Sequence, residues 1–201
     1  MVVIGKTWDS FWKIGTREVV TDRVGCALIG IGSFIALTAL GAFVWIPLPF
    51  TPVPITLQTF FVLLAGALLG KKLGTLSQLG YVLLGSLGLS IFAGATGGLI
   101  PLFGPTGGYL LGFILAAYVI GRVLSIKEKA NFGWVVLSMA IGSLIIYLLG
   151  AIQLALVVHL GVKKALLLGV IPFIPGDILK LFAASSLYYK LQERAGKIFP
   201  R

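Results

Sequence analysis

Three long stretches of this chain contain no charged side chain, and this feature restricts the fold more than any other. They cover residues 24–70, 73–121 and 130–162, and none contains Asp, Glu, Lys or Arg. A helix that crosses a lipid bilayer needs about 20 predominantly apolar residues. The first two stretches are each long enough for two such helices and the third for one. The chain is therefore predicted to be an integral membrane protein.

Prolines and charged turns divide these stretches into expected membrane spans. Four prolines within residues 47–54 rule out a regular helix there. The predicted fold class is all-α, a bundle of six transmembrane helices over residues 24–192, with an N-terminal segment (1–23) and a C-terminal tail (193–201). The N-terminal segment is either an amphipathic helix on the inner membrane surface or a frayed tail. The expected spans are 24–46, 55–70, 75–92, 109–124, 133–158 and 176–191.

Lysine and arginine are distributed unequally between alternate connections. The two terminal segments and the turns at 71–72 and 122–129 are basic, whereas the connections at 47–53 and 93–108 carry no charge. Because cytoplasmic loops have an excess of Lys and Arg, both termini are expected inside the cell. The two lysines at 163–164 fall on the outer side and are an exception to this pattern.

The remaining composition excludes several classes of protein. The net charge is +10, but the basic residues lie at the ends of apolar runs, so no nucleic-acid partner is expected. The single cysteine, Cys26, excludes an intrachain disulfide, and the single histidine, His159, has no nearby metal ligands in the sequence. No metal site, cofactor, catalytic residue or cleaved signal peptide is predicted. The segment 66–72 (GALLGKK) has neither the glycine spacing nor the hydroxyl residue of a phosphate-binding loop.

Asp177 and Lys180 are the strongest candidates for a binding site. They are the only charges well inside an apolar span, and three residues apart they share one face of a helix. A charge at the bilayer centre costs about 2.5–3.5 kcal/mol on insertion scales, so such residues are functional candidates by default. The alternative is that Asp177 caps the helix and that Lys180 extends to the interface.

Three further features have two readings each. Gln58, an amide in an apolar span, is either a ligand contact or an interhelical hydrogen bond. The uncharged loop at 93–108 repeats the triplet Thr-Gly-Gly and is either a pocket wall or an ordinary flexible loop. The small residues Gly32 and Ala36 permit close helix approach, either within the chain or in docking to another membrane protein.

Four segments together resemble the BioY family, the biotin-specific substrate-binding components (S components) of energy-coupling factor (ECF) transporters. Their order and spacing agree with the family as well, and the resemblance covers essentially residues 24–192. The segments are 52–59 (PVPITLQT), 92–98 (FAGATGG), 104–109 (GPTGGY) and 174–180 (IPGDILK).

The resemblance implies a six-helix membrane bundle that captures biotin at the outer face of a prokaryotic plasma membrane. It places Asp177 and Lys180 at the biotin head group and Tyr109 in the pocket wall. Thr96 is a further implied contact, at a position where some members have Asn. Leu110 stands where some members have Arg, so no residue is assigned to the biotin carboxylate. The other implied contacts are Gly94, Gly97, Gly98 and Gln58.

The resemblance also implies partners. A separate transmembrane coupling protein and two ATP-binding-cassette ATPases would supply the energy, which agrees with the missing phosphate-binding loop. Two other functions remain open from the sequence. One is a stand-alone biotin facilitator or secondary transporter, although no convincing half-to-half repeat is present. The other is a membrane enzyme, for which the spans supply no acid, base or metal constellation beyond Asp177 and Lys180.

Overall fold

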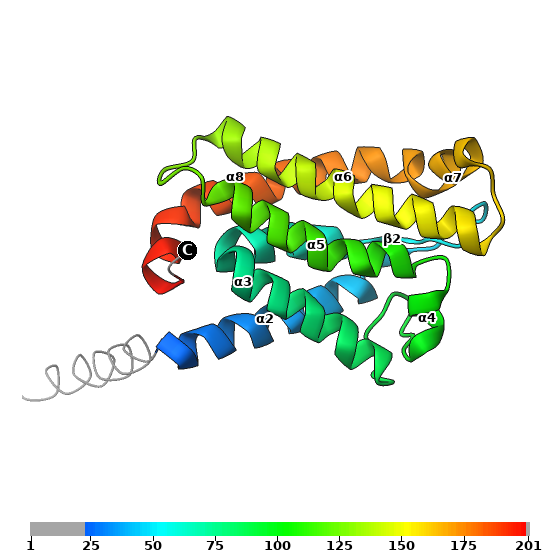
Figure 1. The fold of residues 1–201 in the computed structure, drawn as a ribbon, viewed down its shortest axis with the longest axis horizontal. Coiled ribbons are helices and arrows are strands. Elements are labelled where there is room, and N and C mark those ends of the chain that lie inside the picture. Colours follow the sequence, from blue (N-terminus) through cyan, green and yellow to red (C-terminus); the bar gives the residue numbers. More distant parts are fainter. Residues whose placement is uncertain (1–22, 200–201) are drawn as a thin grey trace, which may run out of the picture.

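Five long helices follow the apolar stretches in the computed structural model, which describes residues 23–199 (Figure 1). Four of these helices coincide with candidate membrane spans, and the last lies mostly within a fifth candidate span, Val162–Gly196. Their bounds are α2 Arg23–Phe43, α3 Gln58–Ser86, α5 Gly107–Leu124, α6 Phe132–Val157 and α8 Ile174–Ile198. Shorter elements connect them: β1 Trp45–Ile46, β2 Ile55–Thr56, α4 Leu99–Phe103, α7 Val162–Gly169 and the 3-10 helix η1 Ile171–Phe173.

The helix α3 is broken at Gly70, where the backbone has φ 77° and ψ 180°. This region of conformational space is accessible essentially only to glycine. Just beyond the break, a Cβ atom on Gly74 would lie 2.7 Å from the carbonyl oxygen of Ala65. In a straight helix these two residues would be roughly 13 Å apart. The two arms of α3, 58–69 and 71–86, are therefore separate helical segments.

Several predicted helix boundaries were wrong. The first helix ends at Phe43, because the prolines that follow favour extended backbone. The β1 and β2 strands on either side of the proline segment pair instead, with Trp45 opposite Thr56. The third predicted span ends at Ser86 rather than at residue 92, and the left-handed Gly88 (φ 111°) follows. The last helix continues beyond the predicted end at residue 191 to Ile198.

Two connections contain helices that the sequence analysis did not predict. The short α4 lies within the uncharged loop 93–108. The helix α7 is amphipathic: Ala165 and Gly169 are buried, whereas Lys163 and Lys164 are exposed. The predicted N-terminal segment lies almost entirely outside the described residues.

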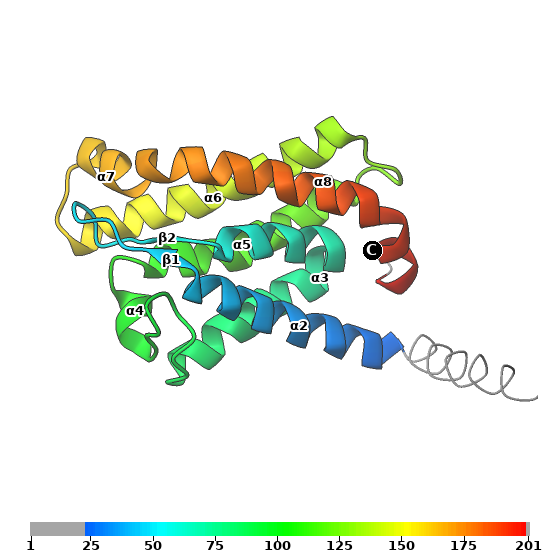
Figure 2. The same cartoon turned by 180° about the vertical axis from the view of Figure 1, so that it is seen from behind.

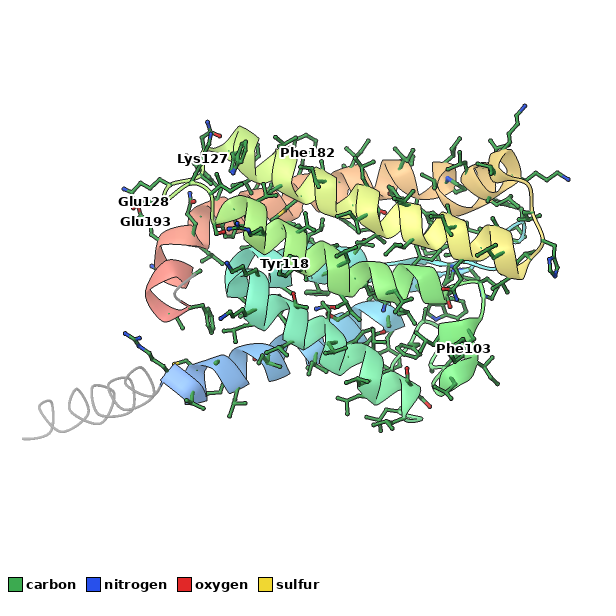
Figure 3. All side chains as sticks on the ribbon, viewed as in Figure 1. Phe103, Tyr118, Lys127, Glu128, Phe182 and Glu193 are labelled. Carbon is green, nitrogen blue, oxygen red and sulfur yellow. The ribbon has the colours of Figure 1, made fainter. Side chains whose placement is uncertain are left out.

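The helices pack with α3 at the centre, in contact with α2, α5 and α8, and α5 packs against α6. Many large apolar side chains point away from the bundle, among them Phe103 and Phe182, which are 72% and 50% exposed (Figure 3). Such an apolar exterior suits a lipid environment rather than water. The composition of this surface and the length of the helices make the protein an integral membrane protein.

The two ends of the bundle differ. The beginning of α2, the end of α8 and the connection between α5 and α6 lie at one end (Figures 1 and 3). Basic residues outnumber acidic ones on these segments: Glu128 and Glu193 stand against Arg23, Lys127, Lys129, Lys190 and Arg194. The β1–β2 hairpin, α4 and α7 lie at the opposite end, which the view from behind shows as well (Figure 2). We call the first the basic end and the second the hairpin end.

Candidate functional site

A cavity of about 490 Å³ lies between the β1–β2 segment, the loop that contains α4, and helices α3, α5, α6 and α8. Cavities of this size, with mostly apolar walls and a few polar groups, are typical of small-molecule binding sites. The chain segments that form it are far apart in sequence and include parts of all four motifs. Its apolar walls include Trp45, Leu48, Val53, Phe92, Phe113, Ile146 and Phe173.

Asp177 and Lys180 form an ion pair in the wall of this cavity. The Lys180 Nζ atom lies 2.5 Å from Asp177 Oδ1, and their side chains are 14% and 12% exposed. The Lys180 ammonium also donates to the Thr56 carbonyl oxygen (2.7 Å) and to Thr59 Oγ1 (3.2 Å). Both residues come from the first turns of α8, and the hydrogen bonds of Lys180 reach across to β2 and the start of α3.

The carboxylate of Asp177 is held on both of its oxygens. Thr59 Oγ1 donates to Oδ1 at 3.1 Å, and the Tyr147 hydroxyl of α6 donates to Oδ2 at 2.6 Å. Hydrogen bonds to an ionised acceptor are about twice as strong as neutral ones. Three helices therefore converge on one carboxylate and fix its position in the cavity wall.

This geometry does not support the alternative in which the pair only caps and stabilises α8. The helix begins at Ile174, and its N-terminus has no side-chain cap hydrogen bond. The ammonium of Lys180 is turned inward to Thr56, Thr59 and Asp177 rather than outward to the interface.

Gln58 forms the interhelical hydrogen bond that the sequence allowed and also faces the cavity. Its Nε2 donates to the Tyr81 hydroxyl at 2.6 Å, and that hydroxyl donates to the carbonyl oxygen of Ile91 at 2.9 Å. The residue is only 4% exposed and also lines the cavity. Because the single hydroxyl proton of Tyr81 is used by Ile91, the amide must present N–H to Tyr81. The Oε1 atom of Gln58 is then the part left for another partner, and it is an acceptor.

The predicted contacts in and next to the glycine-rich loop form two groups, those that line the cavity and those that shape the loop. Gly94 and Thr96 line the cavity, as does Tyr109, whose hydroxyl donates to the Gly169 carbonyl oxygen at 2.6 Å. Gly97 and Gly98 are not among the lining residues. They shape the loop instead: a Cβ on Gly97 would lie 2.5 Å from the Leu89 carbonyl oxygen, and Gly98 has a positive φ of 85°. The N–H of Gly98 donates to the Gly85 carbonyl oxygen at 2.7 Å.

Sequence reasoning missed Tyr147 and the role of Thr59 at Asp177. A tyrosine within an apolar span is usually a core or interface residue, so Tyr147 carries no local signal. Thr59 lies in one of the four motifs but only as a neighbour of Gln58. Thr59 lies 118 positions before Asp177 in the sequence, and Tyr147 lies 30 positions before it, so neither contact has a local sequence signal.

Gly32 and Ala36 are exposed on the outer face of α2. A Cβ atom on Gly32 would meet no other atom within 4 Å. The small residues thus do not serve packing within the described part of the chain, and the docking interpretation remains.

A helical membrane bundle with a largely apolar cavity and one partly buried ion pair in its wall defines an integral membrane protein with a candidate small-molecule site. The chain belongs to the BioY family, whose family model matches residues 16–197. This confirms the family predicted from the four motifs.

The chain is similar to several known proteins. The biotin transporter BioY of Thermotoga maritima is 48% identical over 166 residues, which cover 83% of this chain and 95% of the relative. A probable biotin transporter BioY of Pyrococcus horikoshii is 44% identical, covering 81% and 93%. The crystal structure of the S-component for biotin from an ECF-type ABC transporter superposes with a TM-score of 0.78 at 29% identity, covering 83% of this chain and 90% of the other.

Proposed function

We propose that this chain is a biotin-binding S component that takes up biotin as part of an ECF transporter, and that it is not an enzyme. The observation that carries the proposal is the partly buried Asp177–Lys180 pair in the wall of an otherwise neutral cavity. The family, the relatives named as biotin transporters and the solved S-component for biotin all support it. Biotin is the cargo in this proposal, and no cofactor is needed.

The polar groups of the cavity suit the head group of biotin. The ureido ring offers two N–H donors and one carbonyl acceptor, and the fused rings are apolar. One N–H is expected to donate to Asp177 Oδ2, which accepts from Tyr147 alone within the described protein. The second is expected to donate to Gln58 Oε1. Lys180 contributes its positive charge beside the ureido carbonyl, while the apolar walls enclose the rings.

The orientation in the membrane follows from the distribution of charge between the two ends. We propose six spans, because the break at Gly70 makes two spans of α3. The basic end, with the beginning of α2 and the end of α8, would face the cytoplasm, and the cavity beside the hairpin end would open outward. In a prokaryote this membrane is the plasma membrane.

Energy for uptake is proposed to come from partner subunits. These are a transmembrane coupling protein and two ATP-binding-cassette ATPases, since the sequence contains no phosphate-binding loop of its own. The exposed face of α2 with Gly32 and Ala36 is the proposed docking surface. A stand-alone facilitator is the second candidate, and slow biotin entry into liposomes that contain this chain alone would favour it.

Equilibrium binding of biotin to purified variants tests the site. Breaking a buried ion pair by removing one partner costs about 3–5 kcal/mol, so Asp177→Asn and Lys180→Met should each weaken biotin binding by roughly 10²–10⁴-fold. Glu193→Gln and Lys129→Met are matched controls, because that pair is 80% and 90% exposed. Near-normal affinity in the Asp177 and Lys180 variants, at unchanged thermal stability, would refute the proposed site.

A further inference from the structure

The cavity contains one charge of each sign, and the two charges neutralise each other. Among the described residues that line it, Asp177 and Lys180 are the only charged side chains, and they are in direct contact. The cavity wall thus has no net charge.

Every donor of the Lys180 ammonium is already used. A lysine ammonium has three N–H donors. Here they reach Asp177 Oδ1, the Thr56 carbonyl oxygen and Thr59 Oγ1 at 2.5, 2.7 and 3.2 Å. A ligand anion could take one of these donors only by breaking a bond within the protein.

The other hydroxyl groups of the wall are neutral and hold the loops in place. Thr96 Oγ1 donates to the Ala93 carbonyl oxygen, and Thr106 Oγ1 donates to that of Pro101. Thr51 Oγ1 accepts from the Val53 N–H. A carboxylate brought into this part of the cavity would lose hydration without gaining a cation, which is unfavourable.

We propose that this cavity recognises biotin through its ureido head alone and does not recognise the charge of its carboxylate. The substrate class of the site then includes neutral carbonyl derivatives of biotin, such as biotinamide. This inference rests on the proposed biotin function. It holds whether the valeryl chain of biotin ends inside the neutral cavity or reaches water at the cavity mouth. In neither position does a negative charge gain a favourable interaction with the protein.

The first experiment compares biotin with biotinamide, in which a primary amide replaces the carboxylate, on the unmodified full chain in detergent. Removal of a hydrogen bond to a charged group typically weakens binding by roughly 10- to 100-fold. We expect the two dissociation constants to agree within about threefold, well below that range. A loss of tenfold or more with biotinamide would overturn the inference and leave the biotin function intact. Failure of both ligands to bind would instead refute the proposed function.

The second experiment asks whether Lys180 leaves its partners to bind the carboxylate. Both ligands are measured on Lys180→Met, with Lys129→Met as the control for an exposed lysine. If Lys180 acts through Asp177 and the ureido head, both ligands lose affinity by the same factor. A variant that loses biotin affinity but keeps that for biotinamide would identify Lys180 as the carboxylate partner and overturn the inference.

Discussion

At the scale of single residues, the site depends on how firmly one carboxylate is held. Asp177 accepts from Thr59 of α3, Tyr147 of α6 and Lys180 of its own helix. Each donor reduces the freedom of the carboxylate before a ligand arrives. Less ordering is then needed on binding, which favours high affinity.

Tyr147→Phe is the cleanest test of this positioning role, because it removes one hydroxyl and keeps the ring. The bond to Asp177 Oδ2 is lost, and a hydrogen bond to a charged group is worth about 1.5–3 kcal/mol. Biotin affinity should fall by roughly 10- to 100-fold as measured by isothermal titration calorimetry. Tyr118→Phe is the control, because Tyr118 is 45% exposed and does not line the cavity. Equal affinities of the two variants would show that Tyr147 does not position Asp177.

The sequence identified some residues of this site and could not identify others. Asp177 and Lys180 are visible because a charge within an apolar span is costly and therefore rare. The sequence gives no signal for Tyr147, because an aromatic ring in such a span needs no special explanation. Its role arises only when α6 and α8 pack together. The family resemblance implies a ligand contact at Gly97, whereas the structure shows that this glycine permits close packing against the Leu89 carbonyl oxygen.

At the scale of elements, the break in α3 is the feature on which the bundle most depends. Gly70 has a backbone conformation open essentially only to glycine. The helix α5 then packs directly on this turn: a Cβ atom on Gly121 would clash with the backbone nitrogen of Lys71 and the carbonyl carbon of Gly70. The bend and the approach of α5 are thus coupled.

Gly70→Ala should destabilise the protein by about 1–3 kcal/mol, the usual cost of such backbone strain. Thermal unfolding in detergent should show a clearly lowered Tm. Gly133→Ala is the matched control, since the nearest atom to its added Cβ is Asn131 Oδ1 at 3.9 Å. If Gly70→Ala were as stable as Gly133→Ala, the break would not require glycine.

Helix existence was predictable from the sequence and several helix ends were not. Apolar length and the paired lysines at 71–72 placed the spans, because both reflect the thickness of the bilayer and the position of its surface. Hydropathy does not distinguish Trp45 and Ile46 in a strand from the same residues in a helix. Their pairing with Ile55 and Thr56 is a tertiary contact across the proline segment. The short α4 and α7 also depend on the packing around them.

At the scale of the whole molecule, the proposed orientation can be tested by labelling single cysteines from outside intact cells. In a Cys26→Ala background, cysteines replace Phe50 and Lys164 near the hairpin end and Lys127 at the basic end. All three residues are exposed. An impermeant thiol reagent should label the first two in intact cells and Lys127→Cys only after permeabilisation. Labelling of Lys164→Cys together with Lys127→Cys would place α7 on the cytoplasmic side and contradict the proposed topology.

Uptake by the whole assembly should depend on the outer face of α2. Gly32 and Ala36 lie one helical turn apart and are exposed, and small residues allow a second helix to approach closely. Leucine at either position would force that helix away, at a cost of about 1–3 kcal/mol. Gly32→Leu and Ala36→Leu should therefore reduce co-purification with the coupling protein and ATP-dependent biotin uptake by roughly 10- to 100-fold.

Biotin affinity of the isolated chain should stay unchanged, because neither residue lines the cavity. Ala183→Leu makes the same kind of change on the exposed surface of α8 and should leave uptake normal. Normal uptake by the α2 variants would place the docking surface on another helix, and weaker biotin binding would indicate a distorted bundle rather than a blocked interface.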